Sequence, residues 1–220
     1  MDMSVYHFKC KAADFYNKLN ENAQQNESEA NRQKRIDNHQ RDMDHLFMLQ
    51  RTIEAHVLVQ ELKTYQEENE QKTEHELLQE GHHPTKKLAR YLTAAGEPKP
   101  TTFHEPHHIV PGKGLYRQRN MMTVRLNLHA HGIGINDPCN GVWLTNFLKN
   151  KPEDWATPEA PPHRKLHGFN YETWIFTKLR NSHLPAHIFL GILKDIKRQL
   201  KDGTHPAKIV EKKDANWTGR

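Results

Sequence analysis

Histidine is the residue that this sequence offers most abundantly for chemistry near neutral pH. Seventeen of the 220 residues are histidine, and nine of them fall between His104 and His187. An imidazole changes its charge close to neutral pH and binds divalent transition metals, so this density indicates proton transfer or metal binding. The sequence therefore predicts a histidine site in the second half of the chain.

His163 and His167 stand four residues apart at the start of a helix predicted from residue 163 to about residue 180. On a helix, two side chains with this spacing leave the same face one turn apart, as two ligands of one metal ion require. Taken alone, the spacing also fits a pair of exposed helix histidines.

His107 and His108 form the second element, where a strand predicted at residues 107–110 runs into the Pro-Gly-Lys-Gly breaker at 111–114. Adjacent strand residues normally face opposite ways, so the backbone must bend there if both serve one site. In that case one histidine is a ligand and the other stands beside the metal as a base. Alone, the pair equally fits buried, hydrogen-bonded histidines.

The elements that must position these histidines differ between the two halves of the chain. Residues 1–100 hold 17 Leu, Ile, Val and Phe, 2 Gly and 3 Pro, whereas residues 101–220 hold 28, 9 and 9. This contrast predicts a helical first half and a loop-rich second half. The fold class expected is mostly α with a small β-hairpin, that is, α+β.

Hydrophobic spacing and turn residues predict the individual elements. In the first half we expect a helix at 4–19, a solvated helix or mobile arm at 20–44, a helical hairpin or coiled-coil arm at 45–80 and a small helix at 85–95. In the second half, beyond a domain boundary near residue 96, we expect a strand at 107–110, helices at 115–131, 163–180 and 185–201, a turn at 135–141 and a strand at 142–144.

Charge divides the chain at the same place. Residues 1–100 carry 14 Lys and Arg against 17 Asp and Glu, and residues 101–220 carry 18 against 10. A basic second half suits a polyanionic partner such as nucleic acid, because clustered cations release phosphate counterions on binding. Cys10 and Cys139 are the only cysteines, so neither a disulfide framework nor a cysteine-based zinc site is indicated.

No stretch of eighteen apolar residues and no signal-peptide pattern occurs in the sequence. We therefore expect no membrane partner and synthesis in the cytoplasm, with any export using a route that reads no signal peptide.

Three motifs in a fixed order resemble the AHH nucleases of the HNH/endonuclease VII superfamily, the His-Me finger enzymes. They are His-His-Ile-Val-Pro at 107–111, Asn-Asp-x-x-Asn-Gly-Val-x-Leu at 136–144, and His-x-x-x-His at 163–167. The likeness covers about residues 103–180. Pro106 replaces the alanine that usually precedes the two histidines, a change that touches backbone shape rather than chemistry.

The resemblance implies a ββα-metal nuclease domain, here residues 96–205, that hydrolyses phosphodiester bonds with DNA favoured as substrate. It implies that His107, His163 and His167 bind one divalent metal ion, that His108 is the general base, and that Asn140 is a structural or base-orienting asparagine. Three imidazoles favour Zn²⁺ or Ni²⁺ by softness, although Mg²⁺ or Mn²⁺ can support turnover.

The resemblance also implies a biological setting. Domains of this family often occur as secreted bacterial toxins or effectors, so we expect an immunity protein as partner and export into target cells by a specialised secretion system. The Gln- and Glu-rich region 1–95 would then dock a secretion carrier or chaperone, dimerise, or bind the immunity protein, and its removal should spare cleavage. Residues 206–220 are expected to form a basic C-terminal tail.

Basic side chains around the predicted motifs are candidates for gripping phosphates. An ordinary solvated face explains the same residues equally well. The candidates are Lys149, Lys151, Arg164, Lys165, Lys178 and Arg180.

A rival from another class is a nucleic-acid-binding or adaptor module stapled by a structural zinc, in which nothing is cut. His108 discriminates between the two hypotheses. A structural site fills its coordination with protein ligands and has no need of an unligated imidazole beside the metal.

Overall fold

The computed structural model describes residues 3–21 and 27–220, and its contacts divide the chain into two compact units, residues 1–60 and 61–220. Within the described residues, no helix has the length and apolar character needed to span a membrane. The domain boundary expected near residue 96 stays a prediction. Residues 61–95 belong to the same compact unit as residues 96–220.

The first unit contains α1 (Met3–Glu21) and the greater part of α2 (Glu29–Glu70). Phe15 is buried, and its ring stacks on that of His39 with the centroids 4.6 Å apart. Side-chain bonds between residues four apart stabilise the polar stretch of α2, which explains a helix with few core residues. These bonds join Gln33 to Asp37, Gln40 to Asp44, and Gln50 to Glu54.

A single helix therefore runs through the segment where the sequence predicted a hairpin or coiled-coil arm at 45–80. α2 continues to Glu70, and the chain turns only at residues 71–73. The helix that follows, α3 (Glu74–Leu78), has five residues and begins at a capping box formed by Thr73 and Glu76. The hairpin prediction was wrong because residues 45–70 contain no glycine or proline that would interrupt the helix.

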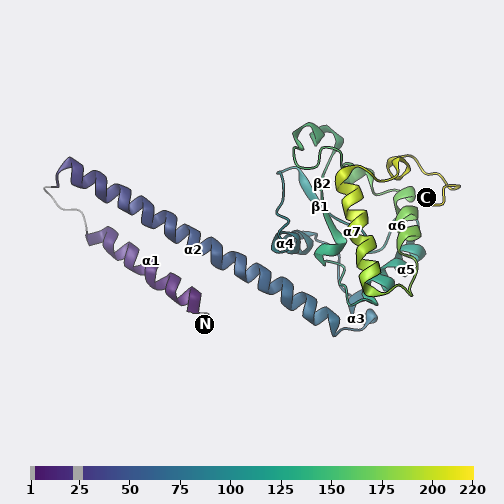
Figure 1. Cartoon of the computed structure of the whole chain (residues 1–220), viewed down its shortest axis with the longest axis horizontal. Helices are drawn as coiled ribbons and strands as arrows, with labels where there is room; N and C mark the ends of the chain where they lie inside the picture. The colour runs from purple at the N-terminus through teal and green to yellow at the C-terminus, as the bar shows by residue number, and fades with distance from the viewer. Residues whose placement is uncertain (1–2, 22–26) are drawn as a thin grey trace. The chain divides into compact units, whose positions relative to one another are not determined.

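The second unit contains the end of α2 and the remaining elements (Figure 1). They are α3, α4 (Lys86–Ala94), β1 (His104–His108), α5 (Gln118–His129), β2 (Gly141–Thr145), α6 (Phe169–Leu179) and α7 (Ala186–Asp202), with 3-10 turns at Pro138–Asn140, Leu148–Glu153, His163–Lys165 and Ala207–Val210. The predicted class is confirmed: the protein is mostly α-helical with a small antiparallel sheet.

The sheet consists of β1 and β2, in which His107 lies opposite Val142 and His108 opposite Gly141. Alternation along β2 sends neighbouring side chains to different cores. Trp143 packs with Leu88 and Leu92 of α4. Val142 joins the main core, to which α5, α6 and α7 contribute. The sheet therefore lies between α4 and α7, as Figure 1 shows.

The ends of several elements differ from the sequence predictions. β1 begins three residues before the strand predicted at 107–110. α5 is shorter than the helix predicted at 115–131. The helix predicted from residue 163 begins only at Phe169, because Gly168 is in an extended conformation. Residues 206–220, predicted as a basic C-terminal tail, pack on the second unit, because Ile209 is buried and Asn170 on α6 donates to the carbonyls of Lys208 and Lys212.

Glu172 on α6 holds the loop that leads into α5. Its buried carboxylate accepts hydrogen bonds from the backbone N–H groups of Leu115, Tyr116 and Arg117. Leu115 and Tyr116 precede the N-cap residue Arg117, so the carboxylate binds the backbone of the loop immediately before the helix. Glu172 thus ties the loop at residues 112–117 to α6, with its negative charge at the positive end of α5.

Replacement of this carboxylate tests the anchor. We expect Glu172→Ala to lower the free energy of unfolding by about 2–3 kcal/mol, because it leaves three backbone N–H groups without their partner. Urea denaturation measures the change. Glu211→Ala is the control, since Glu211 forms an exposed ion pair with Lys208 and should cost less than about 0.5 kcal/mol. Equal losses in the two variants would contradict the assignment.

Candidate active site

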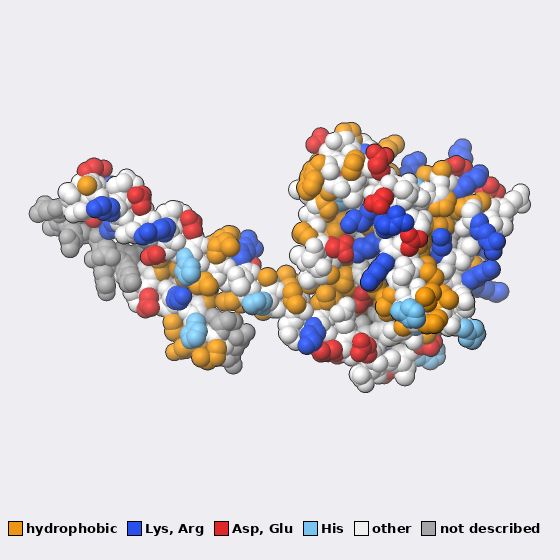
Figure 2. Space-filling view, viewed as in Figure 1, with side chains coloured by type: hydrophobic (Ala, Val, Ile, Leu, Met, Phe, Trp, Pro, Cys, Tyr) orange, Lys and Arg blue, Asp and Glu red, His pale blue; other side chains and the backbone are white. Residues whose placement is uncertain are grey.

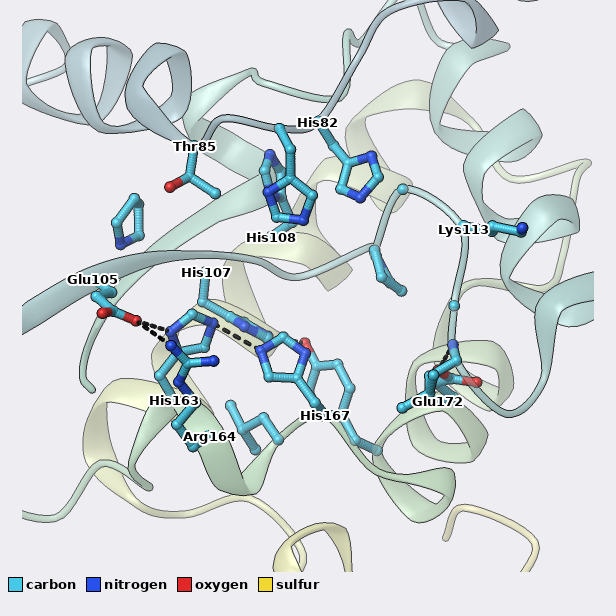
Figure 3. Close-up of a pocket in the computed structure, with 18 residues that line it drawn as sticks. His82, Thr85, Glu105, His107, His108, Lys113, His163, Arg164, His167 and Glu172 are labelled. Atoms are coloured by element: carbon cyan, nitrogen blue, oxygen red, sulfur yellow. Dashed lines mark hydrogen bonds and ion pairs between the residues drawn. The ribbon is translucent and has the colours of Figure 1, made fainter. Parts of the chain in front are cut away.

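A cleft of about 620 Å³ in the second unit brings together residues from β1, the segment before α4, the loop before α5, the 3-10 turn at His163–Lys165 and α6. Figure 3 shows its lining side chains. Six histidines line the cleft: His82, His83, His107, His108, His163 and His167.

β1 sends its two neighbouring histidines to different parts of this cleft. Both residues are paired with β2 in regular register, so the bend that a shared site seemed to require is absent from the pair. His107 points to His163 and His167, whereas His108 lies toward His82 (Figure 3). A regular strand therefore brings both imidazoles to one cleft without bringing them to one point.

His107 is fixed by Tyr171 of α6. The Tyr171 hydroxyl donates its hydrogen to the Ile109 carbonyl at 2.8 Å, so it accepts the hydrogen bond from Nε2 of His107 at 3.0 Å. The neutral ring therefore carries its hydrogen on Nε2 and a lone pair on Nδ1. Nδ1 is buried and has no hydrogen-bond partner among the described residues, an uncommon state for a buried nitrogen.

His163 and His167 lie near Nδ1 of His107. Both belong to the segment before α6 and not to the α-helix that the sequence predicted. His163 lies on the 3-10 turn and His167 just before the Gly168 N-cap. Nδ1 of His163 donates to the Glu105 carboxylate at 3.0 Å, which leaves a lone pair on its Nε2. The Nε2 atoms of His163 and His167 lie 2.9 Å apart. Without a cation, Nε2 of His167 donates a hydrogen to this lone pair; a cation held by both rings would require His167 in its other tautomer, with a lone pair on Nε2 as well.

The three rings form a cluster suited to a cation. One ligand nitrogen from each of His107, His163 and His167 lies within 4.8 Å of the other two. Burial, followed by the charges of His163 and His167, holds the pKa of His107 well below its ordinary value. Burial and His163 lower the pKa of His167 to about 4. Burial also lowers the pKa of His163, so all three imidazoles favour the neutral form, which is the form that binds metal.

The donor set and its surroundings fit a divalent transition metal. Three neutral nitrogens converge, one of them buried and unpaired, and Glu105 and Tyr171 hold the rings from behind. Metal-binding histidines usually donate their second nitrogen's hydrogen to an oxygen in this way, which fixes the ring and its tautomer.

Asn136 holds His108. Nε2 of His108 lies 3.1 Å from the Asn136 side-chain oxygen. The Asn136 amide nitrogen donates to the Glu80 carboxylate and to the Gly81 carbonyl, both at 3.0 Å. Because both partners are acceptors, the amide can face only one way. His108 must therefore donate from Nε2, and its Nδ1 carries the lone pair.

Burial lowers the pKa of His108 to about 4, although the Asn136 hydrogen bond acts in the opposite direction. His108 is consequently neutral near pH 7 and able to accept a proton. A negatively charged ligand in the cleft would raise this pKa toward neutrality.

Asn140, the other predicted site residue, is fully buried and contacts the backbone. Its side chain accepts from the N–H of Val110 at 2.8 Å and donates to the carbonyls of Val110 and Ile135 at 3.2 and 2.9 Å. Among the described residues, none of its hydrogen bonds reaches His108. The contacts of Asn140 support the structural alternative, because they join the end of β1 to the turn before β2.

The predicted phosphate-binding residues are spread more widely. Arg164 lines the cleft, and its guanidinium lies 5.4 Å from the Phe147 ring centroid; the Lys149 ammonium lies 5.8 Å from the same centroid. Lys165 is exposed, whereas Lys178 is partly buried on α6. Lys151 donates to Asp154 and to the Thr157 carbonyl, both at 2.8 Å. Arg180 is exposed at the end of α6.

Sequence reasoning missed Glu105, Tyr171 and Asn136. One of them carries a usable signal, because Glu105 is two residues before His107, on the same side of the strand. Tyr171 contacts His107 across 64 positions, which no spacing rule reports. Asn136 belongs to the Asn-Asp pair of the second motif, but nothing in its spacing indicates that it meets His108.

Comparison with known proteins gives one match. The model of the AHH family, described as a nuclease family of the HNH/ENDO VII superfamily with conserved AHH, matches residues 88–200. The matched region contains β1, β2, α6 and all three histidines of the cluster. No curated protein and no solved structure matches the chain.

Removal of the Asn140 amide tests its structural role. We expect Asn140→Ala to lower the free energy of unfolding by about 2–4 kcal/mol, because it leaves the Val110 N–H and two carbonyls buried without partners. Chemical denaturation of this variant and of Asn181→Ala, an exposed asparagine, measures the difference. If Asn140→Ala were as stable as the wild type, the structural assignment would fall.

Proposed function

This chain belongs to the AHH family of nucleases, and we propose that it is a metal-dependent endonuclease that hydrolyses phosphodiester bonds in DNA. The observation that carries the proposal is the division of roles on β1. His107 presents a buried, unpaired nitrogen to two further imidazoles, and its neighbour His108 stays outside that cluster as a neutral imidazole.

The geometry supports His107, His163 and His167 as ligands of one divalent metal ion, through Nδ1 of His107 and Nε2 of the other two. Imidazole nitrogens favour Zn²⁺ or Ni²⁺, with Mg²⁺ and Mn²⁺ as the alternatives. When bound, such an ion supplies positive charge that balances the charge developing on the phosphate and on the leaving oxygen.

His108 is the general base of the proposed reaction. Its Nδ1 accepts a proton from a water molecule while Nε2 keeps its hydrogen bond to Asn136, which stabilises the imidazolium that forms. The water oxygen bonds to phosphorus, the bond from phosphorus to O3′ breaks, and the leaving oxygen takes a proton from solvent. The products are a 5′-phosphate and a 3′-hydroxyl.

Basic side chains at the cleft support a polyanionic substrate. Lys113 and Arg164 belong to its lining. Lys165 is exposed and follows Arg164 in the sequence, and exposed Lys149 lies near the same Phe147 ring as Arg164. In Figure 2, Lys and Arg side chains are also numerous over the part of the second unit that carries α6, α7 and the C-terminal residues. Lys151 is the weakest of the predicted phosphate ligands, since Asp154 already neutralises it.

Family resemblance supports the biological part of the proposal. The nuclease acts as a secreted antibacterial toxin or effector, made in the cytoplasm and exported by a specialised secretion system. An immunity protein neutralises it in the producing cell, and a secretion carrier or chaperone binds the N-terminal helices. DNA is preferred to RNA as the substrate on the same ground.

A structural-zinc module that binds nucleic acid without cutting it remains the rival, because the same three histidines could close a structural site. His108 favours the nuclease. Its Nε2 is occupied by Asn136, and its ring is directed away from the cluster.

The proposal predicts separate losses from two histidine substitutions. His108→Ala should lower the rate of plasmid cleavage by at least about 100-fold, the contribution expected of a general base, while leaving metal binding intact. His167→Ala should weaken both, because it removes a ligand. The full-length variants would be incubated with plasmid DNA and with total RNA in Mg²⁺, Mn²⁺, Zn²⁺ or EDTA, and metal binding would be measured by calorimetry.

His183→Ala is the matched control, since His183 is exposed and does not line the cleft. It should cleave like the wild type, and EDTA should stop cleavage by both proteins. Full activity of either His108→Ala or His167→Ala would refute the assignments. Intact nucleic acid under every condition would favour the structural-zinc module.

A further inference from the structure

Residues that precede the family match contribute to the cleft. The match begins at Leu88, yet His82, His83 and Thr85 line the cleft and Glu80 lies behind them in contact with Asn136. The family resemblance of residues 88–200 therefore leaves this part of the site unexplained.

The Glu80 carboxylate is the centre of a hydrogen-bonded network. Its side chain is 16% exposed, and one oxygen accepts from the Lys87 ammonium at 2.6 Å and from the Asn136 amide at 3.0 Å. The other oxygen accepts from the Tyr65 hydroxyl at 2.7 Å. Burial alone would raise the pKa of Glu80, but these three donors outweigh it and the pKa is lowered. The carboxylate is therefore ionised near pH 7.

Glu80 is held firmly in this position. Arg125 of α5 donates to the backbone carbonyls of Leu78 and Glu80 at 2.9 and 2.7 Å. Tyr65 is buried against Tyr91, with the ring centroids 4.6 Å apart, and its hydroxyl also accepts from the backbone N–H of Asn136 at 3.2 Å. Gly134 permits this approach, because an added Cβ would lie 2.0 Å from the Tyr65 oxygen.

The Glu80 carboxylate, together with the Gly81 carbonyl, decides which way the Asn136 amide faces, and Glu80 is the charged acceptor of the two. If the amide were reversed, its oxygen would face the Glu80 carboxylate and the Gly81 carbonyl, and its NH₂ group would face His108. His108 would then accept at Nε2 and carry its hydrogen on Nδ1. That tautomer has no lone pair on Nδ1 with which to take a proton from water.

We propose that Glu80 is a positioning residue for phosphodiester hydrolysis: through Asn136 it keeps the hydrogen of His108 on Nε2 and leaves Nδ1 free to accept the proton. This inference rests on the proposed role of His108 as the base. It also extends the functional nuclease unit back to Glu61, so that the N-terminal region expected to be dispensable ends at Gln60 rather than at residue 95.

Kinetics and histidine NMR of the full-length protein test the proposal together. Glu80→Ala should lower kcat for plasmid cleavage by about 10- to 100-fold with little change in KM, because a wrongly protonated imidazole is a poor base. Glu80→Gln, whose amide oxygen can still accept from Asn136, should recover most of this loss. Glu97→Ala is the matched control: it removes an ion pair with Lys197 in the same unit and should keep the wild-type kcat.

The spectroscopic measurement separates positioning from a general loss of structure. In protein labelled with ¹⁵N-histidine at neutral pH, with His108→Gln used for assignment, His108 should be the Nε2–H tautomer in the wild type and in Glu97→Ala. Glu80→Ala should shift it toward Nδ1–H. If Glu80→Ala fails to fold in a urea titration, the wild-type tautomer and the Asn136→Ala variant carry the test, because Asn136→Ala removes the link between Glu80 and His108 and should lower both the Nε2–H population and kcat.

The inference is overturned if wild-type His108 is the Nδ1–H tautomer, or if Glu80→Ala changes neither the tautomer nor kcat relative to Glu97→Ala. Failure of the proposed function gives a different result. In that case His108→Ala cleaves as well as the wild type, or the wild type does not cleave, while the tautomer still responds to Glu80→Ala.

Discussion

The alternation of side chains along a single β-strand is the constraint on which the site depends. His107 and His108 are adjacent, and regular pairing with Val142 and Gly141 sends their rings in different directions. One ring therefore joins the cluster that can hold a cation, and the other stays outside it with a free nitrogen. Two histidines on one face of a helix would both have become ligands, and no base would remain.

Buried polar groups that must find partners fix the rest of the arrangement. Tyr171 accepts a hydrogen bond from one nitrogen of His107, and Glu105 accepts one from His163. These bonds determine which nitrogen each ring offers to the cluster. Asn136 does the same for His108. The tautomers thus follow from the fold, through the oxygen atoms of Tyr171, Glu105 and Asn136.

The sequence was informative where chemistry and local pattern coincide. The fold class followed from the composition of the two halves, and the meeting of His107, His163 and His167 followed from the family resemblance of the motifs. The prediction that His163 and His167 lie on one helix was wrong, because a 3-10 turn and the extended Gly168 replace the start of that helix. Asn136 and Glu80 were not predictable, since their contacts join residues 28 and 56 positions apart and no spacing rule reports such pairs.

Anomalous diffraction at the absorption edge of a bound metal, in crystals of the metal-loaded protein, tests the central claim most directly. The account predicts one ion bound by Nδ1 of His107 and by Nε2 of His163 and His167, with His108 outside the coordination sphere and hydrogen-bonded to Asn136. An ion with His108 as its fourth protein ligand would contradict the account, because a closed site would leave neither a base nor a position for the phosphate.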